Sequence, residues 1–189
     1  MTKQVAIFAS GSGSNAENII KHFENNSNVN IKLVLCNKKD AFVLERAKKF
    51  GIPSVVFSKK QMEEGEILAL LKKEQIDFVV LAGFLLKVPD EMVAAYPNRI
   101  VNIHPALLPN YGGKGMYGMK VHEAVVAAGE RESGITIHFV NEFFDSGETI
   151  FQARCEVLPT DSPEDVATKV HALEYAHFPQ VIESVLAKL

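Results

Sequence analysis

The chain has 189 residues, of which 47% are hydrophobic and 23% charged, and a formal net charge of -3. This composition is that of an ordinary globular domain, and the charge gives no reason to expect nucleic acid or an anionic membrane as a partner. No apolar run approaches the roughly 18 residues of a membrane helix, and Cys36 and Cys155 are too few for a disulfide framework. We therefore expect a single cytoplasmic domain over residues 1–189, with no signal peptide.

Short apolar runs alternate with helical patterns through the first hundred residues. Strands are predicted at 5–9, 31–35, 53–57, 78–82 and 99–103, and helices near 15–27, 40–50, 61–75 and 88–95. Four of the five strand runs are almost wholly apolar, as expected for strands that are covered on both faces. The alternation predicts right-handed βαβ units and a doubly wound parallel sheet, the α/β class.

A glycine-rich turn, Gly11-Ser12-Gly13-Ser14-Asn15, follows the first predicted strand. Glycines permit a tight turn, and the amide groups at the start of the next helix form an anion site. The string also fits the dinucleotide fingerprint, which requires an acidic residue about 20 positions further on. Here the second strand runs into Cys36-Asn37-Lys38-Lys39, and the first acid is Asp40. The turn therefore favours a single phosphate over a dinucleotide, and a turn that binds nothing remains an alternative.

The fifth predicted strand carries Asn102 and His104 just before Pro105. Side chains two residues apart on a strand share a face, and proline ends a sheet ladder. A hydrogen-bond donor and a titratable group thus lie side by side at the carboxyl end of a strand, an arrangement that indicates a catalytic site. Side chains bonded to neighbouring backbone are the alternative.

After residue 130, two strand patterns at 134–140 and 149–155 are separated only by a loop, which predicts an antiparallel pair. The loop contains Asp145. A carboxylate near His104 would raise the pKa of the imidazole and keep it protonated near neutral pH. An ordinary turn-forming aspartate is the alternative.

A final helix is predicted from the capping sequence at residues 161–164 towards Leu189. It carries His171, Glu174 and His177 at i, i+3 and i+6, a possible metal face. Their angular spread is wide and no fourth ligand is evident, so we expect no metal. Three other histidines lack ligand-like spacing and are expected in surface or core roles: His22, His122 and His138.

Together these motifs are characteristic of one family. The glycine-rich turn, Leu81-Ala82-Gly83-Phe84, the string from Asn102 to Pro109 (N-I-H-P-A-L-L-P) and Asp145-Ser146-Gly147 resemble the phosphoribosylglycinamide formyltransferases, a branch of the wider 10-formyltetrahydrofolate formyltransferase and hydrolase group. The resemblance runs from residue 4 to about 188. It implies a twisted, mostly parallel sheet of about seven strands with one antiparallel strand and helices on both faces. A phosphate-binding half would span about 1–100, and a folate and catalytic half about 101–189.

The resemblance implies formyl transfer from 10-formyltetrahydrofolate, as cosubstrate, to the amine of N1-(5-phosphoribosyl)glycinamide in purine biosynthesis. The catalytic trio would be Asn102, His104 and Asp145. Protonated His104 and the Asn102 amide would stabilise the oxyanion that forms on the formyl group, and Asp145 would keep the imidazole charged and oriented.

Binding residues also follow from the resemblance. The phosphate of the ribonucleotide would lie on Gly13, Ser14 and Asn15, and Glu174 would contact the ribose hydroxyls. The folate-binding residues would be Lys60, Leu85, Leu86, Lys87, Val88 and Asn102, with the pterin near the Asp145 loop.

Two segments depart from the family pattern: the glycine-rich loop at residues 112–119 is longer than usual, and the Asp145 loop reads D-S-G-E.

Methionyl-tRNA formyltransferase is disfavoured because that enzyme has a further C-terminal domain. Formyltetrahydrofolate hydrolase is disfavoured because that enzyme has an N-terminal regulatory domain. A nucleotide-binding dehydrogenase and a non-catalytic nucleotide-binding module are the alternatives from other classes. We expect a monomer or homodimer that binds small molecules.

Overall fold

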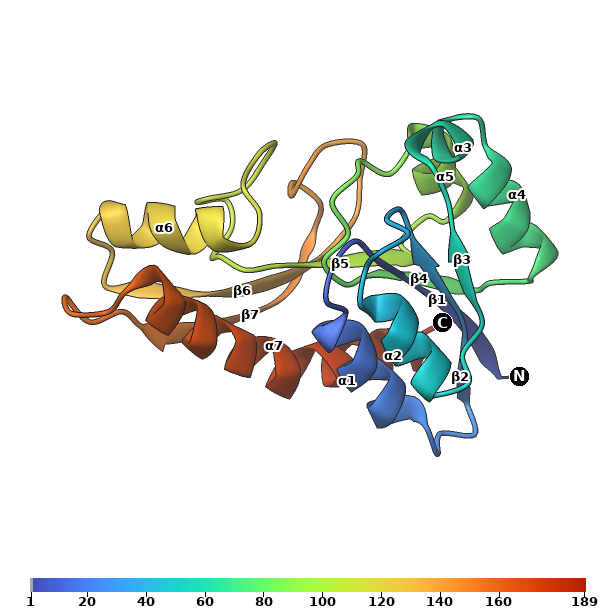
Figure 1. Cartoon of the computed structure of the whole chain (residues 1–189), viewed down its shortest axis with the longest axis horizontal. Coiled ribbons are helices and arrows are strands. Elements are labelled where there is room, and N and C mark those ends of the chain that lie inside the picture. Colours follow the sequence, from blue (N-terminus) through green and yellow to red (C-terminus); the bar gives the residue numbers. More distant parts are fainter. Residues whose placement is uncertain (1) are drawn as a thin grey trace. The chain divides into compact units, whose positions relative to one another are not determined.

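The computed structural model of the chain describes residues 2–189. Its strands are β1 (Lys3–Ala9), β2 (Val29–Cys36), β3 (Ser54–Val56), β4 (Phe78–Leu81), β5 (Ile100–His104), β6 (Glu132–Phe139) and β7 (Thr149–Glu156). Its helices are α1 (Ser14–Phe23), α2 (Val43–Lys49), α3 (Lys59–Glu63), α4 (Glu66–Lys73), α5 (Asp90–Ala95), α6 (Met119–Ala127) and α7 (Pro163–Leu186). The strands follow the order β3-β2-β1-β4-β5-β6-β7 in a seven-stranded sheet (Figure 1). This confirms the predicted mostly parallel α/β fold.

The chain forms two compact units, one that ends at Val101 and includes Lys188–Leu189, and one from Asn102 to Ala187. In the first unit β1 pairs in parallel with β2 and β4, and β2 with β3. Residues 5–9 of β1 are fully buried, which explains their unbroken apolar sequence. Right-handed crossovers place α1 and α2 on one side of these strands and α3, α4 and α5 on the other (Figure 1).

The single helix predicted near residues 61–75 is wrong, because two helices, α3 and α4, occupy this stretch. Gly65 separates them with a φ of 82°, a left-handed conformation that ends one helix and precedes the next. Ser58 and Gln61 form a capping box at the start of α3. The apolar pattern alone gave no sign of this break.

Glu17 on α1 carries the principal ion pairs of the first unit. Its carboxylate pairs with Arg46 of α2 and lies 2.6 Å from Lys21 Nζ. Hydrogen bonds from Lys21 and Arg46 lower the pKa of Glu17 to about 2. A carboxyl whose folded pKa is depressed stabilises the fold above its unfolded pKa, and this contribution is lost as the pH falls through the folded pKa.

We therefore expect Glu17→Gln to lower the free energy of unfolding by about 1 kcal/mol at pH 7, allowing for solvent screening. The deficit should shrink below about pH 4.5 and vanish only below pH 2, where Glu17 is protonated in both states. Urea unfolding at pH 7 and pH 3 measures this difference. Glu63→Gln, at a side chain that is 59% exposed, is the control and should change little; equal deficits at both pH values for Glu17→Gln would contradict the assignment.

In the second unit β6 and β7 form the predicted antiparallel pair, with Ile135 opposite Ala153. A Cβ at Gly134 would lie 2.0 Å from the Ala153 carbonyl oxygen, so the close approach of the two strands requires glycine there. Helix α7 packs on β6, β7 and α6, and its first turn carries a capping box of Ser162 and Asp165.

Helix α6 was not predicted, because it follows a glycine-rich loop that breaks the helical pattern.

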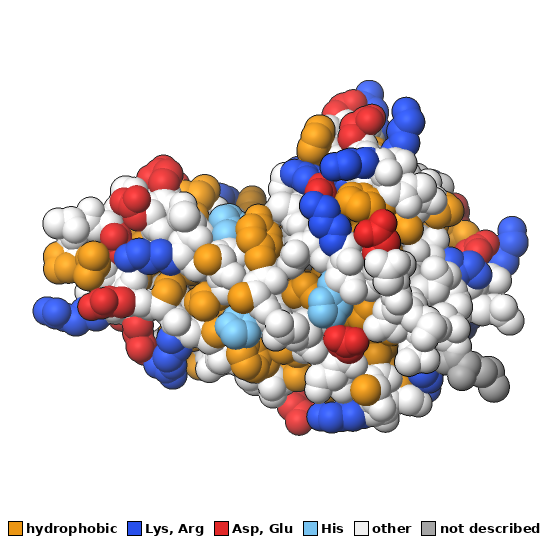
Figure 2. Space-filling model, turned by 90° about the horizontal axis from the view of Figure 1, so that it is seen from below, with side chains coloured by type: hydrophobic (Ala, Val, Ile, Leu, Met, Phe, Trp, Pro, Cys, Tyr) orange, Lys and Arg blue, Asp and Glu red, His pale blue; other side chains and the backbone are white. Residues whose placement is uncertain are grey.

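Over residues 2–189, none of the helices combines the length and the hydropathy needed to cross a bilayer. Charged side chains of both signs are spread over the face shown in Figure 2, where histidine side chains lie beside hydrophobic ones.

Candidate active site

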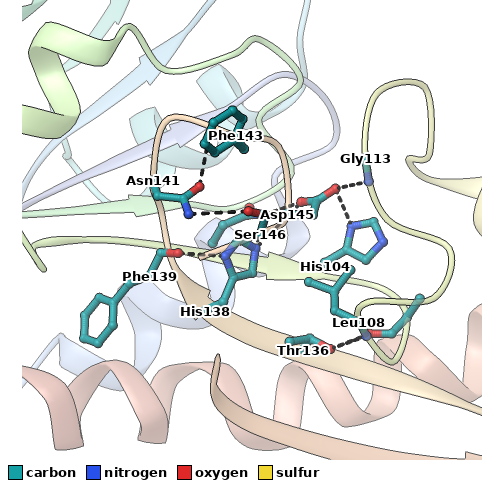
Figure 3. A network of polar contacts seen from close by, with 12 residues as sticks. His104, Leu108, Gly113, Thr136, His138, Phe139, Asn141, Phe143, Asp145 and Ser146 are labelled. Carbon is teal, nitrogen blue, oxygen red and sulfur yellow. Dashed lines mark hydrogen bonds and ion pairs between the residues drawn. The ribbon is translucent and has the colours of Figure 1, made fainter. Parts of the chain in front are cut away.

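Asn102, His104 and Asp145 lie together in the second unit, and Figure 3 shows His104 beside Asp145. The period of β5 places Asn102 and His104 on one face, as predicted. Asn102 Nδ2 donates to Asp145 Oδ1 at 3.4 Å, and His104 Nδ1 lies 3.5 Å from Asp145 Oδ2. His104 is 4% exposed, so its pairing with the carboxylate is largely shielded from water.

The loop between β6 and β7 aims Asp145 at the β5 residues. Asp145 has a φ of 51°, a left-handed conformation that aspartate tolerates better than most residues. A Cβ at Gly147 would lie 1.7 Å from the Phe139 carbonyl oxygen, so this position requires glycine. The amide of Gly113, in the glycine-rich loop, donates to Asp145 Oδ2 at 3.0 Å (Figure 3). This hydrogen bond holds the carboxylate in place.

His138 joins this network, although its sequence position predicted only a surface or core role. Its Nδ1 donates to the Phe139 carbonyl at 2.8 Å, so Nε2 faces Asn102 Nδ2 at 3.2 Å and Asp145 Oδ1 at 3.7 Å. The signal that could have identified it is the alternation of β6, which returns residue 138 to the face of the buried Thr136.

The pKa of Asp145 is lowered. Burial alone would raise it, but the neighbouring His138, the charge of His104 and the Gly113 amide together outweigh burial. Asp145 is therefore an anion at neutral pH.

Burial lowers the pKa of His104, and the charge of Asp145 and the hydrogen bond to the Tyr111 carbonyl oppose this without reversing it. The expectation that Asp145 keeps His104 protonated in the free protein is thus wrong: the cost of burying an imidazolium is larger than the attraction of a carboxylate 3.5 Å away. His104 is neutral in the free chain at neutral pH.

The hydrogen bonds of His104 show where a proton can be added. Nε2 lies 2.7 Å from the Tyr111 carbonyl oxygen, which can only accept, so Nε2 carries the hydrogen of the neutral ring. Nδ1 then faces Asp145 without a proton. Protonation of Nδ1 would create an ion pair with Asp145. The site can therefore hold an imidazolium when a further negative charge nearby offsets the free-energy cost of burying it.

The glycine-rich turn lies in the first unit, at the start of α1. Gly13 precedes the helix with a φ of 73°, and a Cβ there would lie 2.4 Å from Val43 Cγ2 and 2.8 Å from Val43 Cα, so Gly13 cannot be replaced without displacing α2. Ser14 and Asn15 open the helix, and the positive end of the helix dipole there favours an anion. A cavity of about 580 Å³ beside the turn is lined by Ser10, Gly11 and residues 37–42.

Apart from Asn102 of β5, the residues expected to bind folate lie in the first unit, after β4 and on α3. The Leu85 amide donates to Ser10 Oγ at 3.0 Å, and the Leu85 side chain is 41% exposed. Leu86 is half-buried, whereas Val88 is only 4% exposed and packs in the core. Lys87 pairs with Asp90 at the surface, and Lys60 pairs with Glu64 on α3. The structure thus leaves Leu85, Leu86 and the two lysines accessible, but not Val88.

Glu174 is 5% exposed on α7, and His171 Nδ1 lies 2.8 Å from its Oε2. This hydrogen bond raises the pKa of His171. The ring of His177 packs against Phe151 with centroids 4.9 Å apart. Across residues 2–189, no group of three or more His, Cys, Asp and Glu side chains has an arrangement that could hold a metal ion.

Comparisons with known proteins identify the family of the chain. The model of the formyl transferase family matches residues 3–182. The chain is 44% identical over 190 residues to the chloroplastic phosphoribosylglycinamide formyltransferase of Arabidopsis thaliana, covering 97% of this chain and 65% of that protein. It is 36% identical over 190 residues to the phosphoribosylglycinamide formyltransferase of Bacillus subtilis, covering 97% of this chain and 95% of that protein. The chain thus spans just under two thirds of the plant relative and nearly all of the bacterial one.

Solved structures of phosphoribosylglycinamide formyltransferases have the same fold as this chain. The phosphoribosylglycinamide formyltransferase of Anaplasma phagocytophilum superposes with a TM-score of 0.90 at 32% identity, covering 100% of this chain and 89% of that one. The enzyme of the same name from Bacillus halodurans gives a TM-score of 0.89 at 38% identity, covering 98% and 96%. The chain belongs to the formyl transferase family.

Proposed function

We propose that the chain transfers the formyl group of 10-formyltetrahydrofolate to the amine of N1-(5-phosphoribosyl)glycinamide, a step of purine biosynthesis. The observation that carries the proposal is the network of Asn102, His104 and Asp145 in a member of the formyl transferase family. Relatives that bear the name of this activity match 97% of the chain.

In the proposed reaction the neutral amine of the ribonucleotide attacks the formyl carbon. A carbon–nitrogen bond forms, and the formyl oxygen becomes an oxyanion. The Asn102 amide donates a hydrogen bond to this oxygen. To do so, Asn102 gives up its hydrogen bond to His138 or to Asp145.

His104 acts as a general base and then as a general acid. Neutral in the free chain, it takes the proton that the attacking nitrogen releases, and the oxyanion formed beside it then supplies the charge that stabilises the imidazolium. Asp145 stabilises it from the Nδ1 side. The same proton passes to the folate nitrogen as its bond to the formyl carbon breaks, which gives tetrahydrofolate and the formylated ribonucleotide. For Nε2 to accept that proton, it must leave the Tyr111 carbonyl and the ring must carry its own hydrogen on Nδ1, towards Asp145, so the Tyr111 contact opens during turnover.

The substrate-binding residues are also proposals. The Gly13-Ser14-Asn15 turn suits the phosphate because it combines a helix start with a required glycine. Glu174 is a buried carboxylate that can accept hydrogen bonds from ribose hydroxyls. Leu85, Leu86, Lys87 and Lys60 remain candidates for folate, and the buried Val88 can act only through its backbone.

The proposed function is tested by omitting one substrate at a time. Release of tetrahydrofolate should require both 10-formyltetrahydrofolate and the ribonucleotide. Release without the ribonucleotide would identify a hydrolase. No release in the complete mixture, together with tight NADH binding, would favour the dehydrogenase alternative.

The pKa of His104 can be measured directly by an NMR titration of its imidazole in the free protein, assigned by the signal missing from His104→Ala. We expect a midpoint below the usual 6.5, because burial lowers the pKa. Asp145→Asn should move the midpoint lower still, since it removes the charge that raises this pKa. An upward shift in Asp145→Asn, or a wild-type midpoint above 6.5, would contradict the electrostatic account.

A further inference from the structure

His122 on α6 is a buried histidine to which the proposed mechanism gives no part. It is 2% exposed, and its Nδ1 has no hydrogen-bond partner among residues 2–189. Buried polar atoms are nearly always satisfied, because an unpaired one keeps the cost of its desolvation. A buried nitrogen without a partner in the chain therefore points to a partner that arrives with a ligand.

Polar groups on two other elements, α7 and β5, act on His122. The His171 ring of α7 lies edge-on to it, with centroids 6.3 Å apart. Glu174 of α7 and His104 of β5 are the other titratable groups that act on it. Burial lowers the pKa of His122, and the charges of His171 and His104 lower it further while Glu174 raises it. The ring is therefore neutral at neutral pH and can accept or donate one hydrogen bond at Nδ1.

This cluster of His122, His171 and Glu174 selects a particular ligand chemistry. The carboxylate of Glu174 accepts hydrogen bonds, and its Oε2 is already oriented by His171. A neutral imidazole beside it does not attract a second anion. Hydroxyl groups satisfy both, because each hydroxyl can donate to the carboxylate and also exchange a hydrogen bond with an imidazole.

We propose that His122 is a specificity-determining residue that binds a sugar hydroxyl of the ribonucleotide through Nδ1, beside Glu174. This rests on the proposed function, because the ribose belongs to that substrate. His122 stays outside the proton transfer of the reaction, which His104 carries out, so its contribution is to the affinity for the sugar and not to the chemical step.

The test compares the ribonucleotide with its 2′-deoxy and 3′-deoxy analogues as substrates of the wild type, His122→Phe and His122→Asn. Phenylalanine keeps the ring volume without a polar atom, and the asparagine amide places one near the position of Nδ1. We expect His122→Phe to raise KM for the ribonucleotide about 10-fold, the worth of one hydrogen bond. For the deoxy analogue that lacks the bound hydroxyl, the same variant should change KM less than about 2-fold. His122→Asn should recover most of the loss, while kcat and the KM for the folate stay near wild type.

An equal rise of KM for all three sugars, or an unchanged KM for the ribonucleotide, would overturn the proposal. A merely structural role would lower kcat and the melting temperature together, and asparagine would not restore affinity; this outcome also overturns it. Failure of the proposed function is distinguishable, because the wild type would then show no turnover of the ribonucleotide at all. In that case calorimetric binding of the ribonucleotide to the wild type and to His122→Phe still decides the inference, which fails if the two affinities are equal.

Discussion

His104→Ala is expected to lower kcat about 10³-fold while the protein remains folded at 25 °C. The variant removes the base that takes the proton from the attacking amine, together with the cation that stabilises the oxyanion. Removing one donor to an oxyanion typically costs about 3–4 kcal/mol of the barrier. Steady-state assays at saturating substrates measure the loss, and KM for both substrates should change little.

His22→Ala is the matched control, since His22 is an exposed histidine on α1. It should retain wild-type turnover. Circular dichroism and a melting curve establish that His104→Ala is folded, because the side chain it removes is buried and hydrogen-bonded to Tyr111. Turnover within a few-fold of wild type in folded His104→Ala would remove His104 from the mechanism.

Asp145→Asn should lower kcat about 10²- to 10³-fold. Asparagine has nearly the same shape and also tolerates the positive φ of 51° at this position, so the loop should keep its conformation. What it removes is the negative charge that stabilises the His104 imidazolium. The acceptor for the Gly113 amide is also weakened, since one carboxylate oxygen becomes an amide group.

Asp90→Asn provides the comparison, because Asp90 forms an exposed pair with Lys87 away from the catalytic network. It should leave kcat unchanged. If Asp145→Asn kept full activity, or if its loss were matched by Asp90→Asn, the electrostatic role of Asp145 would be refuted.

Most of the fold could be predicted from the sequence, because continuous apolar runs are typical of strands that are buried on both faces. The fully buried residues 5–9 and 78–80 of β1 and β4 are continuous apolar stretches, and the half-polar alternation of β6 marks an antiparallel strand. Helix α6 and the division at Gly65 were missed, because both depend on glycine conformations that a hydrophobic pattern does not encode.

Asn102 and His104 were found because a strand period places them on one face, whereas His138 needed the pairing of strands distant in sequence. The protonation state of His104 could not be predicted. It depends on how deeply the ring is buried, and only the structure shows that burial outweighs the nearby carboxylate.

The central claim is that the formyl group passes directly to the ribonucleotide amine at the Asn102–His104–Asp145 site. It is tested most directly by following a ¹³C label in the formyl group of 10-formyltetrahydrofolate through a single turnover. The account predicts that all of the transferred label appears as the N-formyl carbon of the ribonucleotide product and that none appears as free formate. Label released as formate, or retained on the folate when both substrates are bound, would contradict it.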